Sequence, residues 1–115
     1  MKKEIDATRR VECGFGGTSV TVQVGEKFYY EFHRHGSAGE DSEFEISDNT
    51  VIMHERTESE YLHPERMKPG RTGRDAELCK WFFKALRPGK ATLTVRTMYR
   101  FEMKDECRID VTVVF

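Results

Sequence analysis

The chain has few of the residues that cross-link a small protein. Only three cysteines and three prolines occur among its 115 residues. An odd cysteine count at long spacing fits neither a dense disulfide framework nor a zinc-ligand pattern, so folds of those two kinds are excluded. We expect Cys13, Cys79 and Cys107 to be reduced by default. The open alternative is a disulfide between Cys79 and Cys107, which could lie next to each other on adjacent strands.

The chain also lacks an excess of charge of either sign. Nineteen Lys and Arg stand against twenty Asp and Glu, a net charge of −1. A general nucleic-acid or membrane-surface binder needs a basic excess, so neither kind of partner is expected. One local group of basic residues is predicted to be a solvated loop rather than an anion site. It consists of Arg66, Lys68, Arg71 and Arg74.

Long hydrophobic runs are missing as well. No run approaches the length needed to cross a membrane. Lys2 and Lys3 are not followed by the apolar stretch of a signal peptide, so none is expected in the sequence as given. The compartment therefore stays open between the cytoplasm, by default, and secretion of a chain expressed without its signal.

The most informative segment present is residues 81–95, in which apolar and polar side chains alternate on both sides of Pro88-Gly89. Period-two alternation around a Pro-Gly corner predicts two strands joined by a turn. The alternation also predicts which side chains face the core. They are Trp81, Phe83, Ala85, Ala91, Leu93 and Val95.

The same alternation recurs along the chain, and no stretch has a convincing helical period. Further strands are predicted at residues 20–24, 28–34, 44–46, 51–53 and 109–115. Residues 35–42 are predicted as a loop, 55–74 as a long polar excursion and 98–105 as a crossing between strands. About seven to eight short strands predict an all-β, immunoglobulin-like antiparallel β-sandwich. We expect one domain over residues 1–115, with residues 1–17 as an N-terminal extension or first strand.

No constellation typical of catalysis or metal binding is present. His33 and His35 would share a strand face, and His54 and His63 could approach them, but no further ligand follows at a diagnostic spacing. We therefore predict surface histidines, with no metal and no cofactor. The serines lack a nucleophile-elbow context, and cysteines within strand patterns are usually buried and inert. The chain is predicted not to be an enzyme, which directs attention to its loops.

The strands and turns follow one another in a characteristic order. Val20-Thr21-Val22-Gln23-Val24-Gly25-Glu26 is followed by an aromatic strand, a loop ending in glycine, a second glycine loop and the Pro88-Gly89 hairpin. Over about residues 18–115, this order resembles the chagasin-like inhibitors of papain-type cysteine peptidases. The resemblance implies an immunoglobulin-like fold and a papain-like cysteine peptidase, or another protein, as partner. It also implies non-covalent inhibition by loops that enter the peptidase cleft.

The resemblance implies three binding loops at one end of the sandwich. The first family loop reads Asn-Pro-Thr-Thr-Gly, and His35-Gly36-Ser37-Ala38-Gly39 matches it by keeping the last glycine. The second reads Gly-x-Gly-Gly, and Gly70-Arg71-Thr72-Gly73 keeps the outer two glycines. The third reads Arg-Pro-Trp, and Tyr99-Arg100-Phe101 keeps an aromatic residue. Tyr99 and Phe101 are the candidate anchors, unless they finish a strand and pack in the core.

The loops depart from the family pattern in ways that leave a second function open. The first loop has no proline, so it is predicted to be less preorganised and to lose more entropy on binding. Glu40 and Asp41 follow it and would have to stay hydrated at the rim of a cleft. The frame of the chain also fits generic immunoglobulin-like modules. The alternative function is therefore a structural or protein-interaction module without inhibitory activity.

Overall fold

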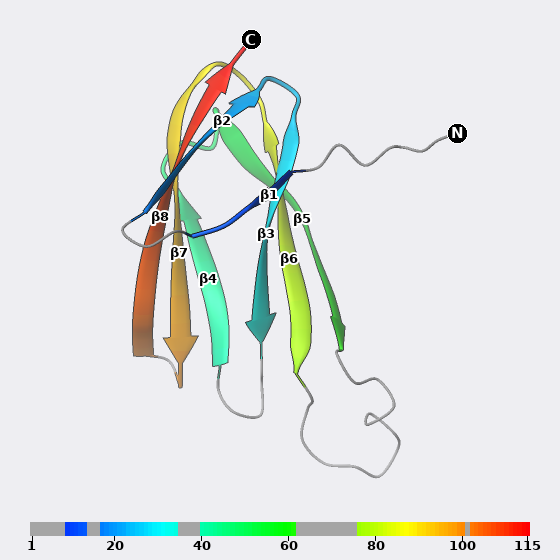
Figure 1. The fold of residues 1–115 in the computed structure, drawn as a ribbon, viewed down its shortest axis with the longest axis vertical. Coiled ribbons are helices and arrows are strands. Elements are labelled where there is room, and N and C mark those ends of the chain that lie inside the picture. The colour runs from blue at the N-terminus through cyan, green and yellow to red at the C-terminus, as the bar shows by residue number, and fades with distance from the viewer. Residues whose placement is uncertain (1–8, 14–16, 35–39, 62–75, 101) are drawn as a thin grey trace, which may run out of the picture.

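The computed structural model describes residues 9–13, 17–34, 40–61, 76–100 and 102–115, and these residues form eight strands (Figure 1). Among the described residues there is no helix that could cross a membrane. The strands are β1 (Arg9–Val11), β2 (Thr18–Gln23), β3 (Lys27–Arg34), β4 (Glu40–Ile46), β5 (Ile52–Tyr61), β6 (Glu77–Ala85), β7 (Gly89–Tyr99) and β8 (Glu102–Val114).

The strands form two four-stranded sheets, which confirms the predicted all-β sandwich. Sheet A has the order β1-β3-β6-β5, and sheet B has the order β2-β8-β7-β4. Most neighbours are antiparallel, but β1 runs parallel to β3 and β2 runs parallel to β8. The chain therefore crosses from sheet A to sheet B between β1 and β2. This N-terminal region adds one edge strand to each sheet.

The core lies between the two sheets and is largely aromatic. The predicted apolar face of residues 81–95 is confirmed, because all six of its side chains are buried. Trp81 of β6 packs on Phe32 of β3, with ring centroids 4.2 Å apart. It also meets Phe44 of β4 edge-on at 4.8 Å, which joins sheet A to sheet B. Trp81 is thus a core residue and not a binding platform.

Two strands, β4 and β5, extend into segments that were predicted to be a loop and a polar excursion. β5 continues to Tyr61 although residues 55–61 were assigned to the polar excursion. It lies at the edge of sheet A, where charged side chains on the outer face remain in water, so polarity does not prevent a strand. β4 begins at Glu40, two residues before the end of the predicted loop.

The predicted crossing at residues 98–105 is also wrong. β7 runs to Tyr99 and β8 begins at Glu102, and these two residues are paired in a hairpin. Pairing between β7 and β8 shifts register after Thr97, which indicates a bulge near the tip. A bulge interrupts the alternation on which a sequence-based assignment depends, so the strand ends could not be recognised there.

The expectation of reduced cysteines is wrong for two of the three. Cys13 and Cys107 form a disulfide with a Cα–Cα distance of 6.0 Å. Cys79 is a free, buried thiol on β6, so the alternative pairing of Cys79 with Cys107 is also wrong. Cys13 lies where the chain crosses between the sheets, which brings it beside β8. Sequence spacing could not show this contact, because the two residues are 94 positions apart.

The disulfide predicts a specific thiol count and a reductant-dependent stability. Without reductant, the unfolded protein should expose one titratable thiol, that of Cys79. The double variant Cys13→Ser/Cys107→Ser should lower the free energy of unfolding by about 2–4 kcal/mol, because the open chain gains entropy when unfolded. Urea titrations with and without dithiothreitol measure this. If dithiothreitol leaves the urea midpoint of the wild type unchanged, the pairing of Cys13 with Cys107 is contradicted.

The core predicts a large difference between two phenylalanines. Phe83 has no exposed surface, whereas Phe115 is 91% exposed. Phe83→Ala should lower the free energy of unfolding by about 3–5 kcal/mol through lost burial and a cavity. Phe115→Ala should leave the unfolding midpoint unchanged. Equal effects of the two substitutions would show that the sheets do not pack as described.

Candidate functional site

The three loops implied by the resemblance all leave the sandwich from one end. In sheet A, Arg34 pairs with Glu77, and Glu77 pairs with Tyr61, so these residues form one row. In sheet B, Glu40 pairs with Tyr99, and Tyr99 pairs with Glu102. The two rows mark the end of the sandwich that lies at the bottom of Figure 1.

The strand ends follow a simple order across this end of the molecule. In Figure 1 they run β8, β7, β4, β3, β6, β5 from left to right, and β3 and β4 are in contact. Residues 35–39 connect the middle pair, β3 and β4, which belong to different sheets. The connection from β5 to β6 emerges on one side of that pair, and the turn from β7 to β8 on the other.

Most of the predicted binding residues lie outside the described part of the chain. This applies to His35, Gly36, Ser37, Ala38 and Gly39 of the first loop. It applies equally to Gly70, Arg71, Thr72 and Gly73 of the second loop and to Phe101 of the third. Their roles therefore stay predictions. Tyr99 and Arg100 are described, and the strand ends fix where each loop begins and returns.

Tyr99 is the last residue of β7, and the sequence left open whether it anchors a partner or packs in the core. Its side chain is half-buried, so it is not a core residue, and its role as an anchor stays a prediction. The Cζ atom of Arg100 lies 5.2 Å from the ring centroid of Tyr99, and Nζ of Lys104 lies 5.8 Å from it. Cations at such distances from an aromatic face are attracted to it. Lys104, which the sequence did not single out, thus belongs to the same cluster.

Arg100 adopts an unusual backbone conformation at the tip of this hairpin. Its φ angle is +51°, in the left-handed region. Tyr99 and Glu102 are paired, so the turn contains only residues 100 and 101. Two-residue hairpin turns commonly require positive φ, and Asn or Gly usually supplies it. An arginine there costs roughly 1–2 kcal/mol relative to a right-handed conformation.

Arg34 forms an ion-pair cluster at the base of the first two loops. Its Nη2 atom lies 3.3 Å from Oε1 of Glu77, and its Nη1 atom lies 3.7 Å from Oδ1 of Asp41. Glu77 is 6% exposed, which makes it the buried charged residue among those described. The hydrogen bond to Glu77 is the main cause of the raised pKa of Arg34.

Sequence reasoning missed this cluster. Arg34 ends an aromatic strand, and its partner Glu77 is 43 positions away. A single buried glutamate after a long polar segment does not produce the alternation of polar and apolar residues from which buried positions are predicted. The nearby thiol of Cys79 has a raised pKa, chiefly because it is buried, which agrees with its predicted inertness.

The histidines form no metal site in the described residues. There, no group of three His, Cys, Asp or Glu side chains could hold an ion. His33 is exposed, as predicted. His54 is half-buried and not a surface residue, because its ring lies 5.0 Å from that of Phe44 and 5.7 Å from that of Phe83. His35 and His63 lie outside the described residues.

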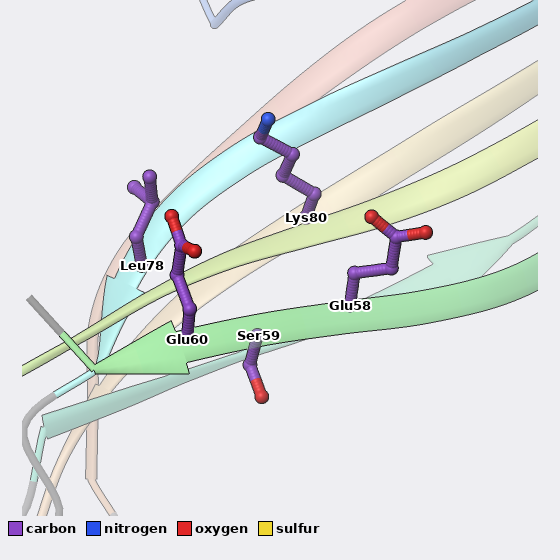
Figure 2. Close-up of a pocket in the computed structure, with 5 residues that line it drawn as sticks. All are labelled: Glu58, Ser59, Glu60, Leu78 and Lys80. Carbon is purple, nitrogen blue, oxygen red and sulfur yellow. The ribbon is translucent and has the colours of Figure 1, made fainter. Parts of the chain in front are cut away.

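A small pocket lies on β5 and β6 near the same end of the sandwich. It has a volume of about 140 Å³, less than the roughly 300–1,000 Å³ of typical ligand sites. Figure 2 shows Glu58, Glu60, Leu78 and Lys80 projecting to one side of the strands, while Ser59 points to the other. Lys80 also lies 5.3 Å from the Tyr29 ring. The pocket offers no paired nucleophile and base, so it does not support catalysis.

Comparisons with known proteins give a match in structure and none in sequence. No protein-family profile and no curated protein sequence matches the chain. The structure matches EhICP2, a cysteine protease inhibitor from Entamoeba histolytica, with a TM-score of 0.71 and 10% identity over 92% of this chain and 95% of that chain. It matches PbICP-C, solved in complex with falcipain-2, with a TM-score of 0.54 and 13% identity over 94% and 99%.

A protein of a different kind shares the fold. Domains 4 and 5 of the S-layer protein SbsC match with a TM-score of 0.50 and 12% identity, over 91% of this chain and 52% of that chain. At such identities a likeness establishes the fold alone. The resemblance to chagasin-like inhibitors is therefore confirmed at the level of the fold, and function has to be argued from the loop-bearing end.

Two substitutions of Arg100 separate the effect of its positive φ on stability from the effect of its contact with Tyr99. Arg100→Gly and Arg100→Val both remove the guanidinium from Tyr99, but valine is β-branched and strongly disfavours positive φ. The glycine variant should therefore be more stable than the valine variant by about 1 kcal/mol. Urea unfolding of both variants measures the difference. A valine variant as stable as the glycine variant would show that the turn does not hold a positive φ.

Proposed function

We propose that this chain is a non-covalent inhibitor of papain-like cysteine peptidases. The single observation that carries the proposal is the convergence of strand ends at one end of the sandwich. There, the candidate loops of residues 35–39, 70–73 and 99–101 all belong to connections between neighbouring strand ends. The fold shared with a cysteine protease inhibitor over most of both chains supports the same function.

The order of the strand ends supports a division of roles among the loops. Residues 35–39 connect β3 to β4 in the middle, so we assign them to the position over the catalytic thiol of the peptidase. Residues 70–73, on the side of sheet A, and residues 99–101, on the side of sheet B, would contact the two walls of the cleft. Occupation of the cleft excludes substrate without any covalent step.

The third loop has the features of a rigid anchor. Its turn is only two residues long, and the aromatic ring of Tyr99, at the end of β7, attracts the cations of Arg100 and Lys104. A side chain fixed before binding loses little entropy when the complex forms. Buried aromatic residues and arginines also dominate interface energies, which favours Phe101 and Arg100 as contacts.

The second candidate function is a structural or interaction module that does not inhibit peptidases. The match to the S-layer protein SbsC favours it, because about half of that two-domain chain shares the fold. The two functions differ in one measurable property. An inhibitor saturates the peptidase at a defined stoichiometry and competes with substrate, whereas a structural module leaves the enzyme activity unchanged.

An inhibition assay tests the proposal directly. The purified protein is titrated against papain or a cathepsin-type peptidase with a fluorogenic peptide substrate. We expect reversible, competitive inhibition, with the chain recovered uncleaved from the complex. Phe101→Ala should raise the inhibition constant by about 30-fold, the loss typical of a buried interface aromatic worth about 2 kcal/mol.

The matched control is Phe115→Ala, at the opposite end of the sandwich. Phe115 is 91% exposed and follows the end of β8, remote from the loop-bearing end. This variant should inhibit like the wild type. A fully folded protein that leaves these peptidases active at micromolar concentration would overturn the proposal and favour the structural module. Equal losses in the two variants would place the contact surface elsewhere.

A further inference from the structure

The ion-pair cluster of Arg34 joins the bases of two candidate loops. Arg34 is the residue before the loop of residues 35–39, and Asp41 is the second residue after it. Glu77 opens β6 directly after the connection that contains residues 70–73. The guanidinium of Arg34, on one side of the first loop, therefore contacts Asp41 on the other side of that loop and Glu77 at the return of the second.

Stability alone is a poor reason for such a pair. Removing a carboxylate from water is costly, and replacing a buried ion pair by apolar side chains is often neutral or stabilising. Glu77 is nearly covered, and its contact with Arg34, at 3.3 Å, is longer than an ideal charged hydrogen bond. The pair does, however, join the last residue of β3 to the first residue of β6, its register partner at the loop-bearing end.

The cluster also spans the gap between the sheets at the position where the first loop emerges. Arg34 and Glu77 belong to sheet A, and Asp41 belongs to β4 of sheet B. The first loop has no proline to restrict its backbone. The contact between Arg34 and Asp41, at 3.7 Å, joins the residues that border this loop and can limit the movement of its two ends.

We propose that Arg34 is a positioning residue of the inhibitory end, which holds the bases of residues 35–39 and of the β5–β6 connection in their binding arrangement through Asp41 and Glu77. This inference rests on the proposed function. Arg34 acts through the loops and need not touch the peptidase. Its loss should therefore shorten the lifetime of the complex without unfolding the domain.

The test uses the double variant Arg34→Met/Glu77→Met, which replaces both charges with apolar side chains of similar length. Its urea midpoint should equal or exceed that of the wild type. Its inhibition constant for papain should rise about tenfold, mainly through faster dissociation. Amide hydrogen exchange of the free protein should accelerate in residues 35–39 and 62–76 and stay unchanged in β7 and β8.

The matched control is Arg96→Met on the outer face of sheet B. Arg96 has shorter contacts than Arg34, at 2.9 Å to Glu45 and 3.0 Å to Glu106, but neither of these partners borders a candidate loop. It should leave the inhibition constant and the exchange of residues 35–39 unchanged. The conservative variant Arg34→Lys keeps the charge. Its complex with the peptidase should therefore dissociate more slowly than that of the double variant, though faster than that of the wild type.

The outcomes separate the two proposals. An unchanged inhibition constant in a stably folded Arg34→Met/Glu77→Met variant would overturn the positioning role. If the wild type fails to inhibit, the proposed function falls, and hydrogen exchange still decides whether Arg34 holds the loop bases. Unchanged exchange in residues 35–39 and 62–76 would overturn the positioning role on its own. Accelerated exchange in those segments alone supports it.

Discussion

The aromatic contact across the two sheets is the interaction on which the rest of the structure depends. Phe44 of sheet B packs edge-on against both Trp81 and Phe83 of sheet A, with centroid distances of 4.8 and 5.4 Å. A single sheet of these strands could not bury its apolar face by itself. The contact fixes how the sheets face each other and therefore which strand ends meet. The row of loop-bearing ends is a consequence of this packing.

Ion pairs on the outer faces of the sheets specify strand register more than they add to the free energy of folding. On sheet B, Arg96 lies within 4 Å of Glu43, Glu45 and Glu106, which come from the strands on either side of β7. Exposed pairs of this kind add little free energy of folding. They do place unlike charges opposite each other on adjacent strands, which disfavours shifted registers. Specific pairing of β4, β7 and β8 keeps the end of β7 beside the start of β4, where Tyr99 is paired with Glu40.

The sequence was sufficient to predict the fold wherever one side of a strand is buried. The alternation of residues 81–95 identified the hairpin and its core face, because water and core impose opposite preferences on successive side chains. The same logic failed where both sides meet water. β5 beyond Glu55 carries polar side chains on both faces, and the bulge after Thr97 interrupts the alternation at the tip of β7 and β8, so only backbone pairing reveals these strand ends.

The candidate loops could be matched to a family pattern in sequence order, but the contacts at their bases could not be predicted. Matching loops to a family pattern needs only local residues, and it pointed to Tyr99 and Arg100. The contacts that hold the loop bases join residues far apart in the chain, as in Arg34 with Glu77 and Cys13 with Cys107. Such contacts depend on topology, and no local pattern of one sequence encodes them.

The parallel pairing of β2 with β8 has a consequence for biosynthesis. Thr18 lies in register with Ile109, so an early strand of sheet B obtains its partner only after the last strand has been made. β3, β5 and β6 of sheet A find their partners within residues 27–85, whereas β2 of sheet B has no partner strand until residues 102–114 are available. Contacts of such long range make folding slow, and unpaired edges are prone to aggregate meanwhile. The unpaired edge of β2 is therefore exposed to aggregation until β8 has been made.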